Sequence, residues 1–317
     1  SMRIKDMFEN LRKEYRASLK SMDTEENIDL AFYRPIGFAW ACLFRKLHVT
    51  PNVVTIASIF IGVAAGICFY YNDLWHTIAG MLLLIWANSY DSADGQLARL
   101  TGQHSRLGRI LDGVSGDFWF VSIYIAICLR TNATVPMFSD HPWIIWVIAA
   151  AAGISHAKQA AVADYYRQFH LLFVKGKAGS ELDSSKELRT RFDELSWKRN
   201  FVAKLTLWFY LGYTVQQESM TPAMQSLRKI LYERYAGGAI PPDMAAEFRK
   251  LSFPLCKWEN FMTFNWRTIF LFASLIADMP WLYFVAELTV FNIVLIYTMR
   301  RHEKICRAML AQLQSGI

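Results

Sequence analysis

Six long stretches of the chain carry almost no charged residues, and polar segments separate them. In chain order they are Asn52–Tyr71, Trp75–Tyr90, Phe118–Leu129, Trp143–Ile154, Thr268–Ala277 and Trp281–Met299. The first is uncharged over about twenty residues, the length that an α-helix needs to cross a bilayer. The third stretch extends back to Leu107 if aspartates are allowed within the span. The fourth continues through a more polar tail to Asp164. The pattern predicts an all-α polytopic membrane protein with six transmembrane helices.

Basic residues are distributed unevenly between these stretches. The segments at 72–76, 130–142 and 278–280 contain one lysine or arginine between them, Arg130. Nearly all other basic residues fall in the alternate segments. Because Lys and Arg are enriched on the cytoplasmic side of membranes, both termini are predicted to be cytoplasmic. Six crossings satisfy the even number that this requires.

The polar segments complete a predicted organisation in five parts. These are a cytoplasmic arm with a juxtamembrane helix (1–50), transmembrane helices one to four (51–167), a helical cytoplasmic or interfacial insert (168–260), transmembrane helices five and six (261–300) and a cytoplasmic tail (301–317). Thr50-Pro51 supplies a helix cap and a first-turn proline before the first span. Within the insert, Phe201–Thr214 is apolar but short and contains Lys204. We expect an interfacial amphipathic helix there, with a re-entrant segment as the alternative.

Composition agrees with this division. The chain has 317 residues, 54% of them hydrophobic and 19% charged, and its net charge is +7. The mean hydropathy of +0.17 is then an average over apolar spans and polar segments. The positive charge reflects sidedness and gives no reason to expect a nucleic-acid partner. The five cysteines form no C-x-x-C pair, so neither a zinc site nor a disulfide framework is indicated.

Three aspartates interrupt the second and third spans near their cytoplasmic ends. Asp91 and Asp94 are three residues apart and share a helix face, and Asp112 lies within the third span. A carboxylate at such depth costs about 2.5–3.5 kcal/mol, and three together would also repel one another. Oxygen ligands without His or Cys suit Mg²⁺, Mn²⁺ or Ca²⁺, and the arginines nearby indicate phosphate chemistry. The alternative is that such aspartates cap helix ends or pair with arginines.

The same residues resemble the CDP-alcohol phosphotransferase family, whose motif is D-x2-D-G-x2-A-R-x8-G-x3-D-x3-D. Seven positions match in type and spacing: Asp91, Asp94, Gly95, Ala98, Arg99, Gly108 and Asp112. The segment Thr50–Thr55 also resembles the family's signature at the start of its first span. The resemblance covers residues 34–165 well and the last two spans loosely.

The resemblance implies a six-helix membrane fold, a homodimer, and a cavity open to the cytoplasm in which one or two divalent ions (Mg²⁺ or Mn²⁺) bind the donor's pyrophosphate. It implies that the metal ligands are Asp91, Asp94, Asp112 and the fourth aspartate. It also implies that the donor nucleotide is bound by Asn52, Thr55, Gly95, Ala98, Arg99, Arg106 and Gly108. For the two glycines, helix–helix packing is the alternative role.

The family's fourth aspartate, proposed as metal ligand and general base, is replaced here. Gly116 occupies its position and Asp117 follows. In a regular helix Asp117 lies about 140° from Asp112 and faces elsewhere. A π-bulge, which Gly113 and Gly116 would permit, could turn Asp117 into the cavity as ligand and base alongside Asp112. Otherwise Asp117 packs between helices and the base comes from elsewhere or from the acceptor's own phosphate, or catalysis is lost.

Polar residues in the last three spans suggest where an acceptor could bind. Ser155, Lys158 and Gln159 lie on the inner half of the fourth span, and Arg267 lies near the start of the fifth. Lys158 and Arg267 could bind an anionic acceptor such as a polyol phosphate. For both, the alternative is that the side chain reaches the membrane interface.

The sequence therefore predicts a phospholipid-synthesising transferase that moves a phospho-alcohol group from a CDP-alcohol to a hydroxyl acceptor and releases CMP. CDP-diacylglycerol is favoured as donor, with inositol, inositol phosphate or another polyol as acceptor. The alternative reverses the roles, with a CDP-headgroup donor and diacylglycerol or ceramide as acceptor. A divalent-cation transporter or a non-catalytic scaffold are the alternatives of another class.

Overall fold

The computed structural model describes residues 2–176, 180–235 and 240–316, and in these ranges the chain is helical without a strand. The prediction of an all-α protein is confirmed. The chain divides into two compact units: Ser1–Ala149 with Phe270–Tyr283, and Ala150–Ile269 with Phe284–Ile317. The long helix α7 (Trp143–Lys175) begins in the first unit and continues into the second.

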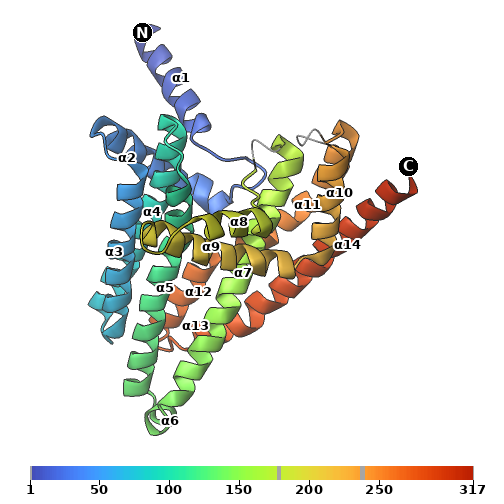
Figure 1. Ribbon diagram of the computed structural model, residues 1–317. Coiled ribbons are helices and arrows are strands. Elements are labelled where there is room, and N and C mark those ends of the chain that lie inside the picture. Colours follow the sequence, from blue (N-terminus) through green and yellow to red (C-terminus); the bar gives the residue numbers. More distant parts are fainter. Residues whose placement is uncertain (1, 177–179, 236–239, 317) are drawn as a thin grey trace. The chain divides into compact units, whose positions relative to one another are not determined.

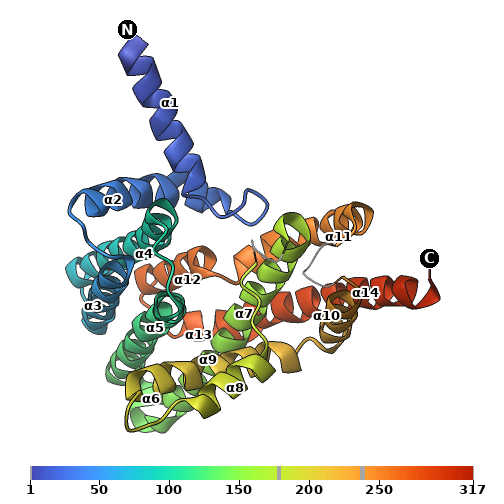
Figure 2. The ribbon, with the colours of Figure 1, turned by 45° about the horizontal axis from the view of Figure 1, so that its top comes forward.

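The first unit holds the helices that carry the aspartate motif. Besides the start of α7 and the end of α12 (Phe264–Ile276), its elements are α1 (Met2–Ala17), a π-helical turn η1 (Asp29–Tyr33), α2 (Arg34–Lys46), α3 (Pro51–Tyr70), α4 (Leu74–Thr101), α5 (Arg106–Thr134) and α6 (Pro136–Asp140). Helix α3 packs against both α4 and α5, and α2 packs against α4 (Figures 1 and 2). The predicted juxtamembrane helix corresponds to α2. Thr50 precedes α3 as predicted, but its side chain makes no capping hydrogen bond.

Small residues bring α3 and α5 into close contact. The facing pairs are Asn52 with Gly108, Gly62 with Trp119, and Gly66 with Ser122. Because the pairs advance together along both helices, α3 and α5 run parallel. A Cβ atom at Gly62 would overlap the indole of Trp119, so this position requires glycine for the two helices to approach.

The second unit contains the predicted insert and most of the C-terminal helices. Besides most of α7, its elements are α8 (Ser185–Glu194), α9 (Phe201–Ser219), α10 (Pro222–Arg234), α11 (Pro242–Phe261), the start of α12, the end of α13 (Leu282–Ala286), a π-helical turn η3 (Glu287–Phe291) and α14 (Asn292–Ser315). Helices α10 and α11 pack on α14, and α8 packs on α9.

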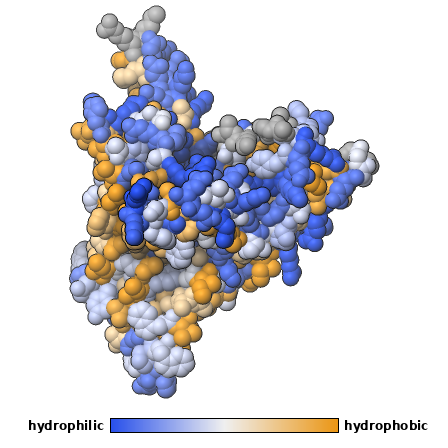
Figure 3. All heavy atoms as spheres, in the orientation of Figure 1, coloured by the Kyte–Doolittle hydropathy of each residue, from blue (hydrophilic) through white to orange (hydrophobic). Residues whose placement is uncertain are grey.

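Within the part of the chain that the structure describes, four helical segments are long and apolar enough to cross a membrane: Pro51–Tyr70, Arg106–Thr134, Trp143–Lys175 and Leu282–Ser315. They coincide with the predicted first, third, fourth and sixth spans. The predicted second span lies in α4, whose polar half after Asn88 lowers its hydropathy, and the fifth lies in α12, which has 13 residues. Hydrophobic side chains reach the surface along α3 and α5, as Figure 3 shows. These apolar helices indicate an integral membrane protein, while the count of six spans stays a prediction.

Helix α9 exposes aromatic side chains on one face and buries Leu207 and Leu211 on another. Trp208 and Phe209 are 53% and 55% exposed, whereas Gln217 is buried and donates to the carbonyl of Ala161. Lys204, which interrupts the apolar pattern in the sequence, is also buried. Its Nζ donates to the carbonyl of Leu195 at 2.7 Å. The helix predicted at 201–214 is therefore present, and its lysine does not break the apolar outer face; its position at an interface stays a prediction.

Candidate metal and donor site

The three motif aspartates converge at the contact of α4 and α5. One carboxylate oxygen each from Asp91, Asp94 and Asp112 lies within 4.8 Å of the others, and no other group of three His, Cys, Asp or Glu side chains with this spacing occurs in the described residues. Asp94 is 3% exposed, Asp91 is half-buried and Asp112 is exposed. The cluster thus has a closed inner end at Asp94 and an open end at Asp112.

Two hydroxyl groups hold the inner carboxylates. Thr55 on α3 donates from Oγ1 to Oδ2 of Asp94 at 2.5 Å, and Ser115 on α5 donates from Oγ to Oδ1 of Asp91 at 3.0 Å. Thr55 therefore orients a carboxylate, and its expected role in binding the donor nucleotide stays a prediction. Ser115 was not predicted, although its position three residues after Asp112 places it on the same helix face.

The donor set fits a hard divalent cation. Three carboxylates in one small volume repel one another, and a buried carboxylate is costly unless a cation or hydrogen bonds offset its charge. The hydroxyl groups of Thr55 and Ser115 orient two of the carboxylates but carry no charge that could neutralise them. Mg²⁺ and Mn²⁺ prefer carboxylate oxygens, and Asp91, Asp94 and Asp112 would be the residues that hold such an ion.

Asp117 is not part of this group. Helix α5 is regular from Arg106 to Thr134, so the π-bulge that would turn Asp117 toward Asp112 is absent there. Asp117 is exposed and follows Asp112 by five residues, which places it on another face of α5. Gly116, at the position of the family's fourth aspartate, borders open space: a Cβ atom there would meet no described atom within 4 Å.

The residues expected to bind the donor nucleotide fall around the cluster in three groups. Asn52 and Gly108 face each other, and a Cβ at Gly108 would lie 2.8 Å from Oδ1 of Asn52. Gly95 and Ala98 are partly exposed on α4, beside the aspartates. Arg106 is exposed at the first position of α5. That these residues bind a nucleotide stays a prediction.

Arg99 is held by a segment that the motif does not include. Its Nε donates to the carbonyl of Ser18, far away in the sequence. Its Nη2 is a buried atom that has no hydrogen-bond partner among the described residues. One side of the guanidinium is therefore anchored, and the other is left with an unused donor.

The residues expected to bind an acceptor take part in a buried network of the second unit. Arg267 is 1% exposed and donates from Nη1 to Glu287 at 3.1 Å and from Nη2 to Gln159 at 2.7 Å. Gln159 in turn donates to Asn292 at 2.8 Å, and Asn292 donates to Ser155 at 3.1 Å. Three of the four predicted residues are thus brought together.

Two details change the earlier interpretation of this group. Arg267 does not extend to a membrane interface, because it is buried and paired with Glu287. Lys158, the fourth predicted residue, is exposed and is not bonded into the network. A role for these four residues in acceptor binding stays a prediction.

Comparison with known proteins places this site in a family. Residues 48–174 match CDP-alcohol phosphatidyltransferase. A phosphatidylinositol phosphate synthase of Cutibacterium acnes is 38% identical over 85 residues, which are 26% of this chain and 40% of that protein. An archaetidylinositol phosphate synthase of Pyrococcus horikoshii is 36% identical over 84 residues, 26% of this chain and 43% of that protein.

A second archaetidylinositol phosphate synthase, from Aeropyrum pernix, is 31% identical over 90 residues, 27% of this chain and 45% of that protein. The chain therefore spans less than half the length of the curated relatives it matches. The matched family region contains the aspartate cluster, Thr55, Ser115 and all the residues expected to bind the donor. Residues 48–174 of this chain are a CDP-alcohol phosphatidyltransferase domain, a member of the family that the aspartate motif resembles.

Proposed function

We propose that this protein is a metal-dependent phosphotransferase that moves a phospho-alcohol group from a CDP-alcohol to a hydroxyl acceptor and releases CMP. The convergence of Asp91, Asp94 and Asp112 within the matched domain carries the proposal. CDP-diacylglycerol is the favoured donor. Inositol phosphate is the favoured acceptor, because the relatives with matching domains are named as phosphatidyl- and archaetidylinositol phosphate synthases.

The reaction exchanges one bond to phosphorus for another. The acceptor's hydroxyl oxygen attacks the phosphorus that bears the alcohol, a new P–O bond forms, and the P–O bond to CMP breaks with its electron pair leaving on CMP. A divalent ion at the cluster would neutralise the phosphate oxygens and the leaving group. Thr55 and Ser115 hold Asp94 and Asp91 in place, so the ligands need little rearrangement when the donor binds.

The hydroxyl proton must pass to a base. Asp112 is the exposed member of the cluster, and Asp117 is the nearest other carboxylate along α5. Since Asp117 lies outside the cluster, the acceptor's own phosphate is the competing base. Turnover of Asp117→Asn, with metal affinity measured in parallel, separates the two: a rate near that of the wild type eliminates Asp117.

Three further expectations belong to this proposal. The site opens to the cytoplasm, since the basic residues cluster in the segments predicted to lie there. The protein acts as a homodimer, as the family resemblance implies. Ser155, Lys158, Gln159 and Arg267 contribute to acceptor binding.

The decisive experiment is a donor–acceptor matrix on the purified chain in lipid, with the product identified by mass. CDP-diacylglycerol with inositol phosphate and Mg²⁺ or Mn²⁺ should yield CMP and a phosphatidylinositol phosphate, and a chelator should abolish both. A CDP-headgroup that reacts only with diacylglycerol or ceramide would reverse the roles. No CMP from any donor would contradict the enzyme proposal.

A further inference from the structure

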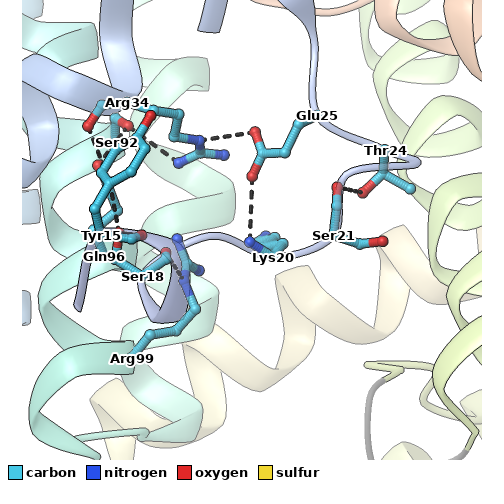
Figure 4. Close-up of polar contacts among 10 residues, drawn as sticks. All are labelled: Tyr15, Ser18, Lys20, Ser21, Thr24, Glu25, Arg34, Ser92, Gln96 and Arg99. Carbon is cyan, nitrogen blue, oxygen red and sulfur yellow. Dashed lines mark hydrogen bonds and ion pairs between the residues drawn. The ribbon is translucent and has the colours of Figure 1, made fainter. Parts of the chain in front are cut away.

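A segment that precedes the matched domain lies against the motif helix. Residues 18–34, called here the N-terminal strap, connect α1 to the start of α2 and lie beside one face of α4 (Figure 4). Ser18 and Gln96 are both fully buried, and Nε2 of Gln96 donates to Oγ of Ser18 and to the carbonyl of Arg34, each at 3.0 Å. The strap is therefore packed onto α4 by specific polar contacts.

Arg34 is fixed at the end of the strap by two partners. Its Nε lies 2.9 Å from Oε2 of Glu25, and its Nη1 donates to Oγ of Ser92 at 3.1 Å. The other oxygen of Glu25 accepts from the backbone N–H of Lys20 at 3.3 Å. Figure 4 shows this chain of contacts running from the strap to α4. The Arg34 side chain is 15% exposed, so the guanidinium has one defined position.

The strap face of α4 adjoins the face that carries the aspartates. Ser92, Gln96 and Arg99 follow the i, i+4, i+7 spacing of one helix face, and Asp91 and Asp94 lie on the neighbouring one. Charge attraction acts on Asp91 from Lys20 and Arg34. Arg34 also repels Arg99, and Glu25 attracts it. Lys20 and Arg34 of the strap are thus close enough to Asp91 for their charges to affect this aspartate.

Arg34 and Arg99 place two guanidinium groups close to each other. Arg34 is paired with Glu25, whereas Nη2 of Arg99 is a buried donor that has no hydrogen-bond partner among the described residues. A guanidinium forms charge-assisted hydrogen bonds with phosphate oxygens, so this unused donor favours an anionic ligand over a neutral one.

We propose that the N-terminal strap is part of the donor site. Arg34, held by Glu25 and Ser92, is a further binding residue for the donor's phosphate groups, and the Ser18 carbonyl positions Arg99 for the same ligand. This inference rests on the proposed function and adds residues outside the matched region 48–174. It assigns the strap to substrate recognition, not only to packing.

The test compares equilibrium binding of CDP with turnover. CDP affinity for the purified full chain with Mg²⁺ is measured by calorimetry, alongside KM and kcat for CDP-diacylglycerol and the unfolding temperature. Arg34→Gln should weaken CDP binding and raise KM on the order of tenfold, since a hydrogen bond to a charged group is lost, and should leave kcat within about twofold. Glu25→Gln should weaken CDP binding less, because Arg34 remains but is no longer held.

The matched control is Arg45→Gln. Arg45 is also on α2 and pairs with an N-terminal carboxylate, Glu14, at 3.1 Å, but it is 39% exposed. This variant should bind CDP as the wild type does. Wild-type CDP affinity in both Arg34→Gln and Glu25→Gln, or an equal loss in Arg45→Gln, would overturn the role of the strap.

If Arg34→Gln does not fold, Arg34→Lys and Glu25→Gln decide the question. Lysine keeps the charge but cannot contact Glu25 and Ser92 together. The CDP affinity of Arg34→Lys should therefore be lower than that of the wild type but higher than that expected for Arg34→Gln. Wild-type affinity in both would overturn the inference. A wild-type chain that binds no CDP and releases no CMP would instead contradict the proposed function itself.

Discussion

Each of the two units contains a group of buried or half-buried charges, and the two groups are balanced in different ways. In the second unit, Arg267 and Glu287 neutralise each other, and the amide oxygen of Gln159 and the carbonyl of Met262 accept from the other nitrogens of Arg267. In the first unit, Asp91, Asp94 and Asp112 are all of one sign. The Arg267–Glu287 network is therefore balanced without a ligand, whereas the three aspartates become favourable only when a cation binds.

This difference separates a network whose charges balance one another from a cluster that needs a cation. Both look alike in the sequence, as polar residues inside apolar helices. What distinguishes them is whether opposite charges meet. Removing one charged side chain should therefore have different consequences in the two groups: a loss of activity at the aspartates and a loss of stability in the Arg267–Glu287 network.

The largest effect is expected at the aspartate with the least solvent access. Asp94→Asn should reduce CMP formation by about 10³-fold, since a charged ligand is removed from the centre of the site. Mn²⁺ binding, followed by electron paramagnetic resonance, should weaken in parallel. Asp140→Asn, in the exposed end of α6, is the control and should behave as the wild type. Normal Mn²⁺ binding in Asp94→Asn would mean that the cluster is not the metal site.

The second effect is on stability. Glu287→Gln should lower the free energy of unfolding by about 3–5 kcal/mol, because Arg267 is left as a buried charge without a counter-charge. Chemical denaturation in a lipid–detergent mixture measures this change. Glu233→Gln, which breaks an exposed pair with Lys229, should cost less than about 1 kcal/mol. Similar small losses in both variants would show that the Arg267 network does not need its ion pair.

A third experiment adds a carboxylate to the cluster. Gly116→Asp places an acidic side chain about 40° around α5 from Asp112, in open space. Apparent metal affinity should rise about tenfold, because affinity increases with the number of charged ligands. Gly113→Asp also enters open space but lies about 100° from Asp112, so it should change the affinity little. Equal changes in both variants would indicate a general charge effect.

The smallest expected effect is a gain in stability, opposite in sign to the loss expected for Glu287→Gln. In the presence of a chelator, Asp112→Asn should raise the free energy of unfolding by about 1 kcal/mol, because it relieves repulsion among the carboxylates. Saturating Mg²⁺ should remove this advantage. Destabilisation of the chelated protein would instead show that Asp112 makes contacts that matter without a metal.

The sequence predicted much of the fold because the helices of this protein are long and their apolar runs are clear. The first, third, fourth and sixth spans and the juxtamembrane helix all lie where uncharged runs place them. The aspartate cluster was also predictable, since the spacing of Asp91 and Asp94 fixes a common face. The second and fifth spans stay predictions, because polar residues lower the hydropathy of α4 and because α12 is short.

What sequence could not supply are contacts between distant residues. The Arg99–Ser18 contact joins positions 81 apart, and Gln159 meets Arg267 across 108 residues. No local periodicity encodes such pairs. Lys204 is a further example. In the sequence this lysine interrupts an apolar stretch, whereas in the structure its ammonium group is buried and donates to the carbonyl of Leu195.

The interlocking of Gly62 with Trp119 also bears on how this protein tolerates bilayers of different thickness. Both residues lie seven positions, about two helical turns, beyond cluster residues, Thr55 on α3 and Asp112 on α5. A sliding motion of one helix along the other would drive the indole into the α3 backbone. Hydrophobic mismatch should therefore tilt these helices together and not shear them. The position of Thr55, which holds Asp94, relative to Asp112 on α5 is then insulated from the length of the lipid chains.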